Sequence, residues 1–316
     1  MEYRSLGCTG LKVSALGFGA SPLGDVFGAI DAREAERAVH CAIDQGINFF
    51  DVSPYYGRTL AETRLGAALG DSRQQVALAT KCGRYGVDEF DFSAQRIRKS
   101  VEESLRRLRS DYVDLLQAHD VEFGDAAQLI EETLPTLREL QREGKARFVG
   151  ITGYPLEFLK RVASAVRVDT ILSYCRYNPL ITDLDRILTP FAREKNIGLI
   201  NASPLHMGML AGGAPPVWHP APDSVRIAGK RVADLLRSHG VEPAVAALRF
   251  CLDHPYVGST LVGMSNREQV ETNLKALEFQ LDSALLERIR AAAGSAMDVT
   301  WRSGRIENST QFEERV

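Results

Sequence analysis

Three polar residues of different chemical types end three successive apolar segments of the chain. Asp51 follows INFF, Lys81 follows VALAT and His119 follows YVDLLQA. Any one of them alone is an ordinary way to end a buried strand. An acid, an amine and an imidazole in this order, with Tyr55 and Tyr56 just after the acid, together indicate one site for moving a proton.

These side chains offer proton transfer to or from an oxygen atom. A tyrosine hydroxyl has an ordinary pKa of about 10, which is too high for proton exchange at neutral pH. A nearby Lys81 ammonium would lower the pKa of a tyrosine, and Asp51 would keep the lysine charged and oriented. His119 would hydrogen-bond the substrate oxygen. Hydride transfer to or from the carbon that bears this oxygen needs such a site.

Alternating strands and helices must bring these side chains together. Each predicted strand is almost wholly apolar, which is typical of strands buried on both faces, and each is followed by a helical pattern. The strands are predicted at residues 13–20, 47–51, 76–81, 112–119, 146–153, 169–175, 198–204 and 258–263. Eight such units predict the α/β class and a closed (β/α)8 TIM barrel, whose active site lies at the carboxyl ends of the strands.

The whole chain, residues 1–316, reads as a single domain because no linker or repeat divides it. The opening residues 1–12 are predicted to form a hairpin that plugs the bottom of the barrel. A long Gly/Pro-rich loop is predicted at residues 208–224, and an extra C-terminal helix precedes a loop-like tail at residues 293–316.

Composition excludes several classes of partner. The net charge of −3 argues against nucleic acid or an anionic membrane, and no apolar run approaches a membrane span. The scattered cysteines favour a reducing compartment, and no cluster has metal-ligand spacing. We therefore expect a cytoplasmic monomer that acts on a small molecule without a metal. The cysteines are Cys8, Cys41, Cys82, Cys175 and Cys251.

The motifs around these residues resemble those of the aldo-keto reductases, (β/α)8 oxidoreductases that use nicotinamide cofactors. DVSPYYG at 51–57 is similar to the family's Asp-x4-Tyr-Gly signature, ATK at 79–81 to its lysine strand and DLLQAHD at 114–120 to its histidine strand. The resemblance implies a catalytic tetrad of Asp51, Tyr56, Lys81 and His119. The five-residue step from the aspartate selects Tyr56, which leaves Tyr55 as a pocket wall.

The same resemblance implies a set of cofactor-binding residues. ASPLHMG at 202–208 is similar to the family's Ser-Pro-Leu loop, and LVGMSNREQVETN at 261–273 to its last cofactor segment. The positions that carry over are Ser203, Leu205, Gly208, Gly263, Ser265, Gln269 and Asn273. Each of them alone also reads as an ordinary loop or helix cap.

Two departures from the family pattern bear on the cofactor. Members that prefer NADP carry lysine or arginine in the last segment, where this chain has Gly263, Ser265 and Gln269, so we expect NAD as the cofactor. NADP is the less favoured alternative, for which the nearby Arg267 would have to supply the missing cation. In the sixth strand the usual glutamine is missing, which leaves Ser173 or Tyr174 for the nicotinamide.

A closer resemblance is to one group of the family, the L-galactose dehydrogenases. It is carried by LGFGASPLG, GINFFDVSPYYG, ATKCGRYG, HDVEFG and PPVWHPA, which are spread along the chain. The resemblance implies NAD-dependent oxidation of the anomeric carbon of an L-sugar, with L-galactose first, to the lactone. The alternatives are an L-fucose or D-threo-aldose 1-dehydrogenase, a pyridoxal dehydrogenase, an NADPH-dependent carbonyl reductase and a non-catalytic regulatory subunit.

Sugar contacts must come from loops above the rim, because hydroxyls need hydrogen-bonding groups and a sugar ring face suits an aromatic platform. Each candidate also has an ordinary packing interpretation. The candidates are Tyr55, Tyr85, Asp120, Trp218 and His219, together with Cys82, Arg84 and Trp301.

Overall fold

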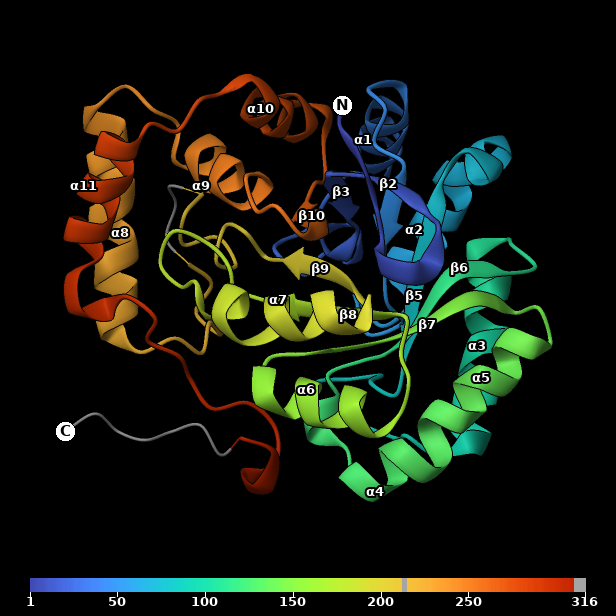
Figure 1. Ribbon diagram of the computed structural model, residues 1–316. Coiled ribbons are helices and arrows are strands. Elements are labelled where there is room, and N and C mark those ends of the chain that lie inside the picture. Colours follow the sequence, from blue (N-terminus) through green and yellow to red (C-terminus); the bar gives the residue numbers. More distant parts are fainter. Residues whose placement is uncertain (212–214, 310–316) are drawn as a thin grey trace.

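The computed structural model describes residues 1–211 and 215–309. Eight parallel strands close into a barrel in the order β10-β3-β4-β5-β6-β7-β8-β9, with helices arranged around it (Figure 1). The predicted (β/α)8 barrel is therefore confirmed. Residues 212–214 of the predicted Gly/Pro loop and residues 310–316 of the predicted tail lie outside the described residues.

The barrel strands are short and their residues are buried almost throughout. They are β3 (Leu16–Gly19), β4 (Phe49–Asp51), β5 (Ala77–Cys82), β6 (Val113–Ala118), β7 (Ala146–Gly153), β8 (Thr170–Tyr174), β9 (Gly198–Ala202) and β10 (Val257–Gly263). Asp51 pairs with Ala79 in register, and Lys81 pairs with Gln117. The carboxyl ends of β4, β5 and β6 therefore meet on one rim, as the positions of the three polar residues predicted.

Most of the helices bury one apolar face. They are α1 (Ala32–Asp44), α2 (Leu60–Leu69), α3 (Ala94–Leu108), α4 (Ala126–Gln128), α5 (Leu134–Arg142), α6 (Leu156–Ala165), α7 (Asp183–Lys195), α8 (Asp223–Ser238), α9 (Pro243–Leu252), α10 (Arg267–Glu278) and α11 (Ser283–Ala293). In α3 the face of Ile97, Val101, Leu105 and Leu108 is buried, and the Ser93 side chain caps the helix.

A π-helical turn at Leu129–Thr133 lies between α4 and α5 in one continuous helical segment. Pro135 lies in the first turn of α5. Because proline has no backbone N–H, it cannot make the regular bond to the preceding turn, which suits a wider turn at this point.

The N-terminal hairpin consists of β1 (Tyr3–Ser5) and β2 (Lys12–Ser14), paired antiparallel. Its side chains Leu6, Leu11 and Val13 belong to the same buried cluster as Phe49 and Leu115 of the barrel strands. The hairpin thus closes the amino-terminal end of the barrel. The single strand predicted at 13–20 was wrong in this detail, because β2 serves the hairpin and β3 serves the barrel.

The C-terminal segment returns to the barrel mouth after α11, which packs beside α8 (Figure 1). Three backbone contacts attach it: Asp298 N–H donates to Leu180 O, Trp301 N–H to the Tyr154 hydroxyl, and Arg305 N–H to Glu122 O. Among the described residues, no helix combines the length and apolar character needed to cross a membrane.

Candidate active site

Lys81 is the centre of a buried polar cluster at the rim. Its Nζ forms an ion pair with Asp51, donates to Val52 O at 2.9 Å and lies 3.3 Å from the Tyr56 hydroxyl. Lys81 and Asp51 are 2% and 4% exposed, so the charges of this pair are shielded from water. The ammonium therefore acts on the tyrosine oxygen through a medium that screens it weakly.

The turn that presents Tyr56 depends on the glycine that follows it. Gly57 has a φ of +61°, and a Cβ there would lie 2.2 Å from Gly24 O. Only glycine fits this close approach in a left-handed conformation. The glycine of the DVSPYYG motif thus holds Tyr56, rather than Tyr55, beside Lys81.

His119 lies at the end of β6 and faces both tyrosines. Its ring meets the Tyr56 ring edge-on, with centroids 5.7 Å apart, and the Tyr55 ring at 6.0 Å. Its Nδ1 lies 2.9 Å from the Ser53 hydroxyl. The structure thus brings together Asp51, Tyr56, Lys81 and His119, the four residues of the predicted tetrad.

Burial and neighbouring charges together set the pKa values of Lys81, Asp51 and His119. Burial lowers the pKa of Lys81, but Asp51 and Tyr56 raise it by more than burial lowers it. The net pKa therefore lies above the ordinary lysine value. Burial raises the pKa of Asp51, against the effect of Lys81. Burial, with the charges of Lys81 and Arg84, lowers the pKa of His119 well below its ordinary value. Lys81 is therefore charged and His119 neutral at neutral pH.

The pKa of Tyr56 differs from the sequence-based expectation. Burial raises the pKa of its hydroxyl above the ordinary value, and this effect outweighs the lowering by Lys81. The expectation that Lys81 would bring the pKa down was wrong, because losing the hydration of the phenolate costs more than the ammonium restores. Tyr56 is a neutral phenol at neutral pH.

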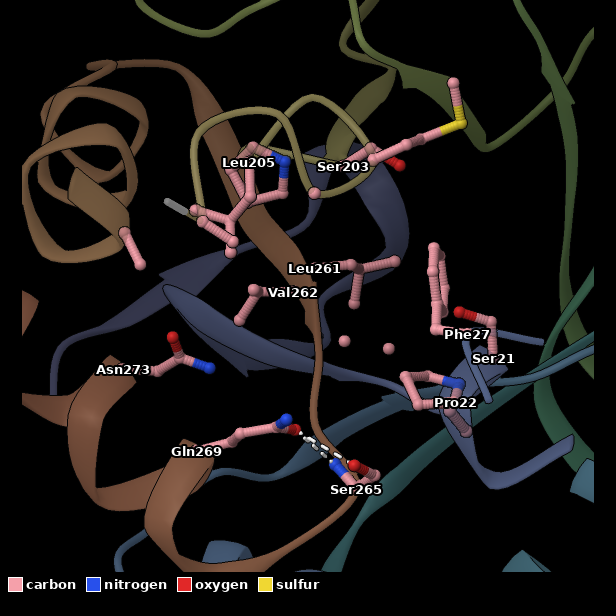
Figure 2. Close-up of a pocket in the computed structure, with 18 of the residues that line it drawn as sticks. Ser21, Pro22, Phe27, Ser203, Leu205, Leu261, Val262, Ser265, Gln269 and Asn273 are labelled. Atoms are coloured by element: carbon pink, nitrogen blue, oxygen red, sulfur yellow. Dashed lines mark hydrogen bonds between the residues drawn. The ribbon is translucent and has the colours of Figure 1, made fainter. Parts of the chain in front are cut away.

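A cavity of about 570 Å³ opens beside this cluster and reaches both Asp51 and Tyr56. In Figure 2, Ser203 and Leu205 lie at the top of the cavity and Gln269 and Ser265 at the bottom. Asn273 lies at the left, and Phe27 and Pro22 at the right. Seven of the eight predicted cofactor residues line it. They are Ser203, Leu205, Gly208, Gly263, Ser265, Gln269 and Asn273.

The far end of this cavity meets the first turn of α10. Asn266 caps the helix by accepting from Gln269 N–H, and the Gln269 side-chain oxygen accepts from the N–H and hydroxyl of Ser265 at 2.8 and 3.1 Å (Figure 2). A Cβ at Gly263 would lie 2.9 Å from Pro22 Cγ, so glycine is needed where two walls of the cavity converge.

Charges on the described lining of the cavity are all negative. Glu242 and Glu268 line it together with Asp51, and no lysine or arginine does so among the described residues. Arg267 does not line it; its guanidinium instead pairs with Glu271 at 2.7 Å. A ligand with an extra phosphate group at this end would therefore meet carboxylates rather than cations.

Ser173, the eighth predicted cofactor residue, is buried on β8 outside the described cavity lining. Its hydroxyl has no hydrogen-bond partner among the described residues, and neither has the side-chain oxygen of Asn201, its register partner on β9. Buried polar atoms are normally paired. Neither residue lines the described cavity, so contact of Ser173 with a nicotinamide stays a prediction.

Three of the predicted sugar contacts, Tyr55, Arg84 and Asp120, lie at the rim beside His119. The Arg84 guanidinium forms an ion pair with Asp120 and stacks 3.9 Å from the centre of the Tyr55 ring. The His119 Nε2 lies 3.8 Å from Asp120 Oδ2. Burial raises the pKa of Asp120, although Arg84 lowers it. Tyr55 and Asp120 are thus placed where a substrate oxygen near His119 would meet them.

Tyr85 does not lie at the rim, which corrects the expectation for that residue. Its hydroxyl accepts from Gly83 N–H at 3.1 Å, and the Arg96 guanidinium of α3 covers its ring at 3.7 Å. Contact with a residue of the surrounding helix layer places Tyr85 on the outer side of β5.

His219 and Trp218 also differ from the sequence-based picture. His219 is buried, accepts from Ala221 N–H at 3.0 Å and bonds to His206 O, so it supports its own loop. Trp218 is 52% exposed and packs on Phe27, with ring centroids 5.8 Å apart, beyond the described cavity lining. Both placements agree with packing rather than with contact to a ligand at the tetrad.

Trp301 and Cys82, the further candidates for sugar contact, are buried. The Trp301 ring stacks on Tyr154 at 4.5 Å between centroids, and the Cys82 thiol donates to Gln117 O.

Comparison with known proteins identifies the family. A model of the aldo/keto reductase family matches residues 15–293. The chain belongs to this family. This aldo-keto reductase is 46% identical to an L-galactose dehydrogenase of Arabidopsis thaliana, over 98% of this chain and 99% of that protein. It is 30% identical to a D-threo-aldose 1-dehydrogenase of a Pseudomonas species, over 90% and 95% of the two chains.

A solved structure agrees with the barrel. An aldo-keto reductase from Bacillus halodurans in its holo form superposes with a TM-score of 0.78 at 27% identity, covering 98% of this chain and 99% of that one. The chain is therefore an oxidoreductase of a family that uses nicotinamide cofactors.

The residues around the cavity fit a nicotinamide dinucleotide. Ser203, Ser265, Gln269 and Asn273 line the cavity with hydroxyl and amide groups, which can hydrogen-bond the ribose and pyrophosphate of such a cofactor. Ser203 and Leu205 would hold the opposite side of the dinucleotide.

Sequence reasoning missed Ser53 and Gln117. Gln117 Nε2 donates to Asp51 Oδ2 at 3.0 Å and so orients the carboxylate that pairs with Lys81. Gln117 carries a readable pattern, because it lies on β6 two positions before His119 and side chains alternate along a strand. Ser53 lies after the end of β4, where strand alternation does not place its side chain.

Proposed function

We propose that this aldo-keto reductase oxidises the anomeric carbon of an L-aldose, L-galactose first, to the lactone with NAD as cofactor. The observation that carries the proposal is the contact of Lys81 with both Asp51 and Tyr56 beside the cavity. The identity of 46% to an L-galactose dehydrogenase, over nearly the full length of both proteins, supports the choice of sugar.

In the proposed reaction Tyr56 carries the proton and His119 orients the oxygen. Tyr56 accepts the proton of the anomeric hydroxyl in its ionised form, which is a minor fraction at neutral pH and grows as the pH rises. The Lys81 ammonium 3.3 Å away stabilises this ionised form. Neutral His119 donates a hydrogen bond to the same oxygen. A nicotinamide cofactor, when bound, takes up the hydride from the anomeric carbon.

The proposed preference for NAD rests on charge. The 2′-phosphate of NADP needs cationic partners, whereas Glu242 and Glu268 line the cavity and Arg267 is paired with Glu271. NAD presents a neutral ribose hydroxyl at that position, and a carboxylate can accept its hydrogen bond.

The proposed sugar site is the rim formed by Tyr55, Arg84 and Asp120. The Asp120 carboxylate offers acceptors for ring hydroxyls while Arg84 fixes its orientation. The Tyr55 ring, held by Arg84, gives one flat wall for a pyranose. The opposed charges of Arg84 and Asp120 compensate each other, which suits a neutral polyol better than an anionic substrate.

The decisive experiment measures initial rates of NAD reduction with a panel of L- and D-aldoses and pyridoxal. We expect L-galactose to give the highest kcat/KM and the product to be the lactone. A higher value for L-fucose, a D-threo-aldose or pyridoxal would move the assignment to that substrate. Fast carbonyl reduction with NADPH and no aldose oxidation would make the chain a carbonyl reductase, and no turnover at all would favour a regulatory subunit.

A further inference from the structure

Ser53 is a buried residue in direct contact with His119. Its side chain is fully buried, and its Oγ lies 2.9 Å from His119 Nδ1. The same oxygen accepts the backbone N–H of Tyr55 at 3.1 Å. These two groups are its only hydrogen-bond partners in the described part of the chain.

The two contacts together determine which way the hydroxyl points. A serine hydroxyl has one proton to donate and lone pairs to accept with. Tyr55 N–H already uses a lone pair. If His119 Nδ1 also donated to Ser53, the hydroxyl proton would be buried without an acceptor, which costs about 1–3 kcal/mol. The hydroxyl therefore donates to Nδ1, and a neutral ring then carries its proton on Nε2.

The opposite side of the ring leaves this proton available. Asp120 Oδ2 lies 3.8 Å from Nε2, too far for a hydrogen bond, and Arg84 holds that carboxylate in an ion pair. Lys81 and Arg84 are the cations near the ring, and together with burial they keep it neutral. Nε2–H can thus be given to a substrate oxygen.

We propose that Ser53 is a positioning residue which fixes His119 as the tautomer that carries its proton on Nε2. His119 then acts only as a hydrogen-bond donor to the substrate oxygen, and Tyr56 remains the group that exchanges the proton. The tautomer follows from the contacts of Ser53, whereas its effect on turnover rests on the proposed aldose oxidation.

Nitrogen-15 NMR of the full chain with labelled histidine tests the tautomer without any substrate. The signal of His119 is assigned by its loss in His119→Asn. We expect a pyridine-type Nδ1 and a pyrrole-type Nε2 at neutral pH. A pyrrole-type Nδ1, or a doubly protonated ring, overturns the proposal.

Three variants separate positioning from packing. Ser53→Ala removes the donor, and we expect kcat to fall about 10- to 100-fold, the size of effect that partners orienting a metal-bound histidine have. Ser53→Thr keeps a hydroxyl, and we expect it to restore most of the turnover and the Nε2–H signal. Ser259→Ala is the matched control, since this buried serine donates to Ser14 O in the hairpin at the closed end of the barrel.

The outcomes distinguish this proposal from the proposed function. Wild-type turnover in a folded Ser53→Ala variant whose Nε2–H signal persists would show that Ser53 does not set the tautomer. If Ser53→Ala does not fold, the nitrogen shifts of the wild-type chain still decide. Absence of aldose oxidation by the wild type would refute the proposed function, while the same shifts would still decide the tautomer.

Discussion

Replacing Lys81 by methionine removes the charge on which the cluster depends while keeping most of the side-chain volume. Lys81 and Asp51 are almost completely buried, and Lys81 Nζ contacts Asp51, Val52 O and the Tyr56 hydroxyl. Breaking a buried ion pair by removing one partner typically costs about 3–5 kcal/mol, because it leaves an uncompensated charge. We expect Lys81→Met to lose about this much unfolding free energy in urea.

Lys81→Met also removes the positive charge that acts on the Tyr56 hydroxyl. An ammonium 3.3 Å from the hydroxyl stabilises the phenolate by about 5 kcal/mol at an effective dielectric constant of about 20. Without it the pKa of Tyr56 rises further above its ordinary value, because Lys81 is the group that opposes the effect of burial. We expect aldose oxidation at neutral pH to fall by roughly a thousandfold, with the dissociation constant of the cofactor little changed.

A double variant separates the two effects. Asp51→Asn combined with Lys81→Met removes both charges, and buried ion pairs can be replaced by neutral groups at little cost. We expect the double variant to recover most of the lost stability and none of the lost activity. Wild-type stability of Lys81→Met, or near-normal oxidation by the double variant, would refute the reasoning about this pair.

Three further predictions concern pH and cofactor choice. Burial raises the pKa of Tyr56, so its ionised fraction still increases as the pH rises above 7, and we expect kcat/KM for oxidation to increase over the same range. A kcat/KM that falls over this range in the wild type but not in Tyr56→Phe would contradict this. Burial, with the charge of Asp120, raises the pKa of Glu122 from 4.5 to about 8, so the unfolded chain loses this proton first and stability declines as pH rises across that window. Urea unfolding at several pH values measures this decline, and we expect Glu122→Gln to remove up to about 5 kcal/mol of it. An unchanged pH dependence would show that the Glu122 carboxyl is already ionised in the folded chain. Glu268→Lys is expected to shift the ratio of kcat/KM toward NADP by about tenfold, whereas Glu268→Gln gives a smaller shift, and an unchanged ratio in both would place the 2′ position elsewhere.

The barrel and the tetrad could be predicted because each depends on local patterns that repeat. Apolar runs followed by amphipathic helices indicate a barrel, and the polar residues that end successive strands must share a rim. The split between β2 and β3 could not be read, because Ser14 and Ala15 do not interrupt the apolar run where the chain changes partners.

The remaining differences come from tertiary packing. Sequence proximity to Lys81 and Cys82 made Tyr85 look like a rim residue, but its ring turns toward Arg96 of α3. The pKa of Tyr56 depends on burial as well as on Lys81, and no motif reports how much water a folded loop excludes. The contact of Ser53 with His119 could not be read from the sequence, because Ser53 lies after the end of β4 and a serine in such a segment has many other uses.

The most direct test of the account compares Tyr56→Phe with Tyr55→Phe, using the best aldose and NAD. Tyr56→Phe should bind NAD with near wild-type affinity in a fluorescence titration and lose most of its oxidation rate, because the only proton carrier is gone. Tyr55→Phe should retain turnover, with its effect mainly on KM. Near-normal oxidation by Tyr56→Phe, or loss of turnover confined to Tyr55→Phe, would contradict the central claim that Tyr56 exchanges the proton of the sugar hydroxyl.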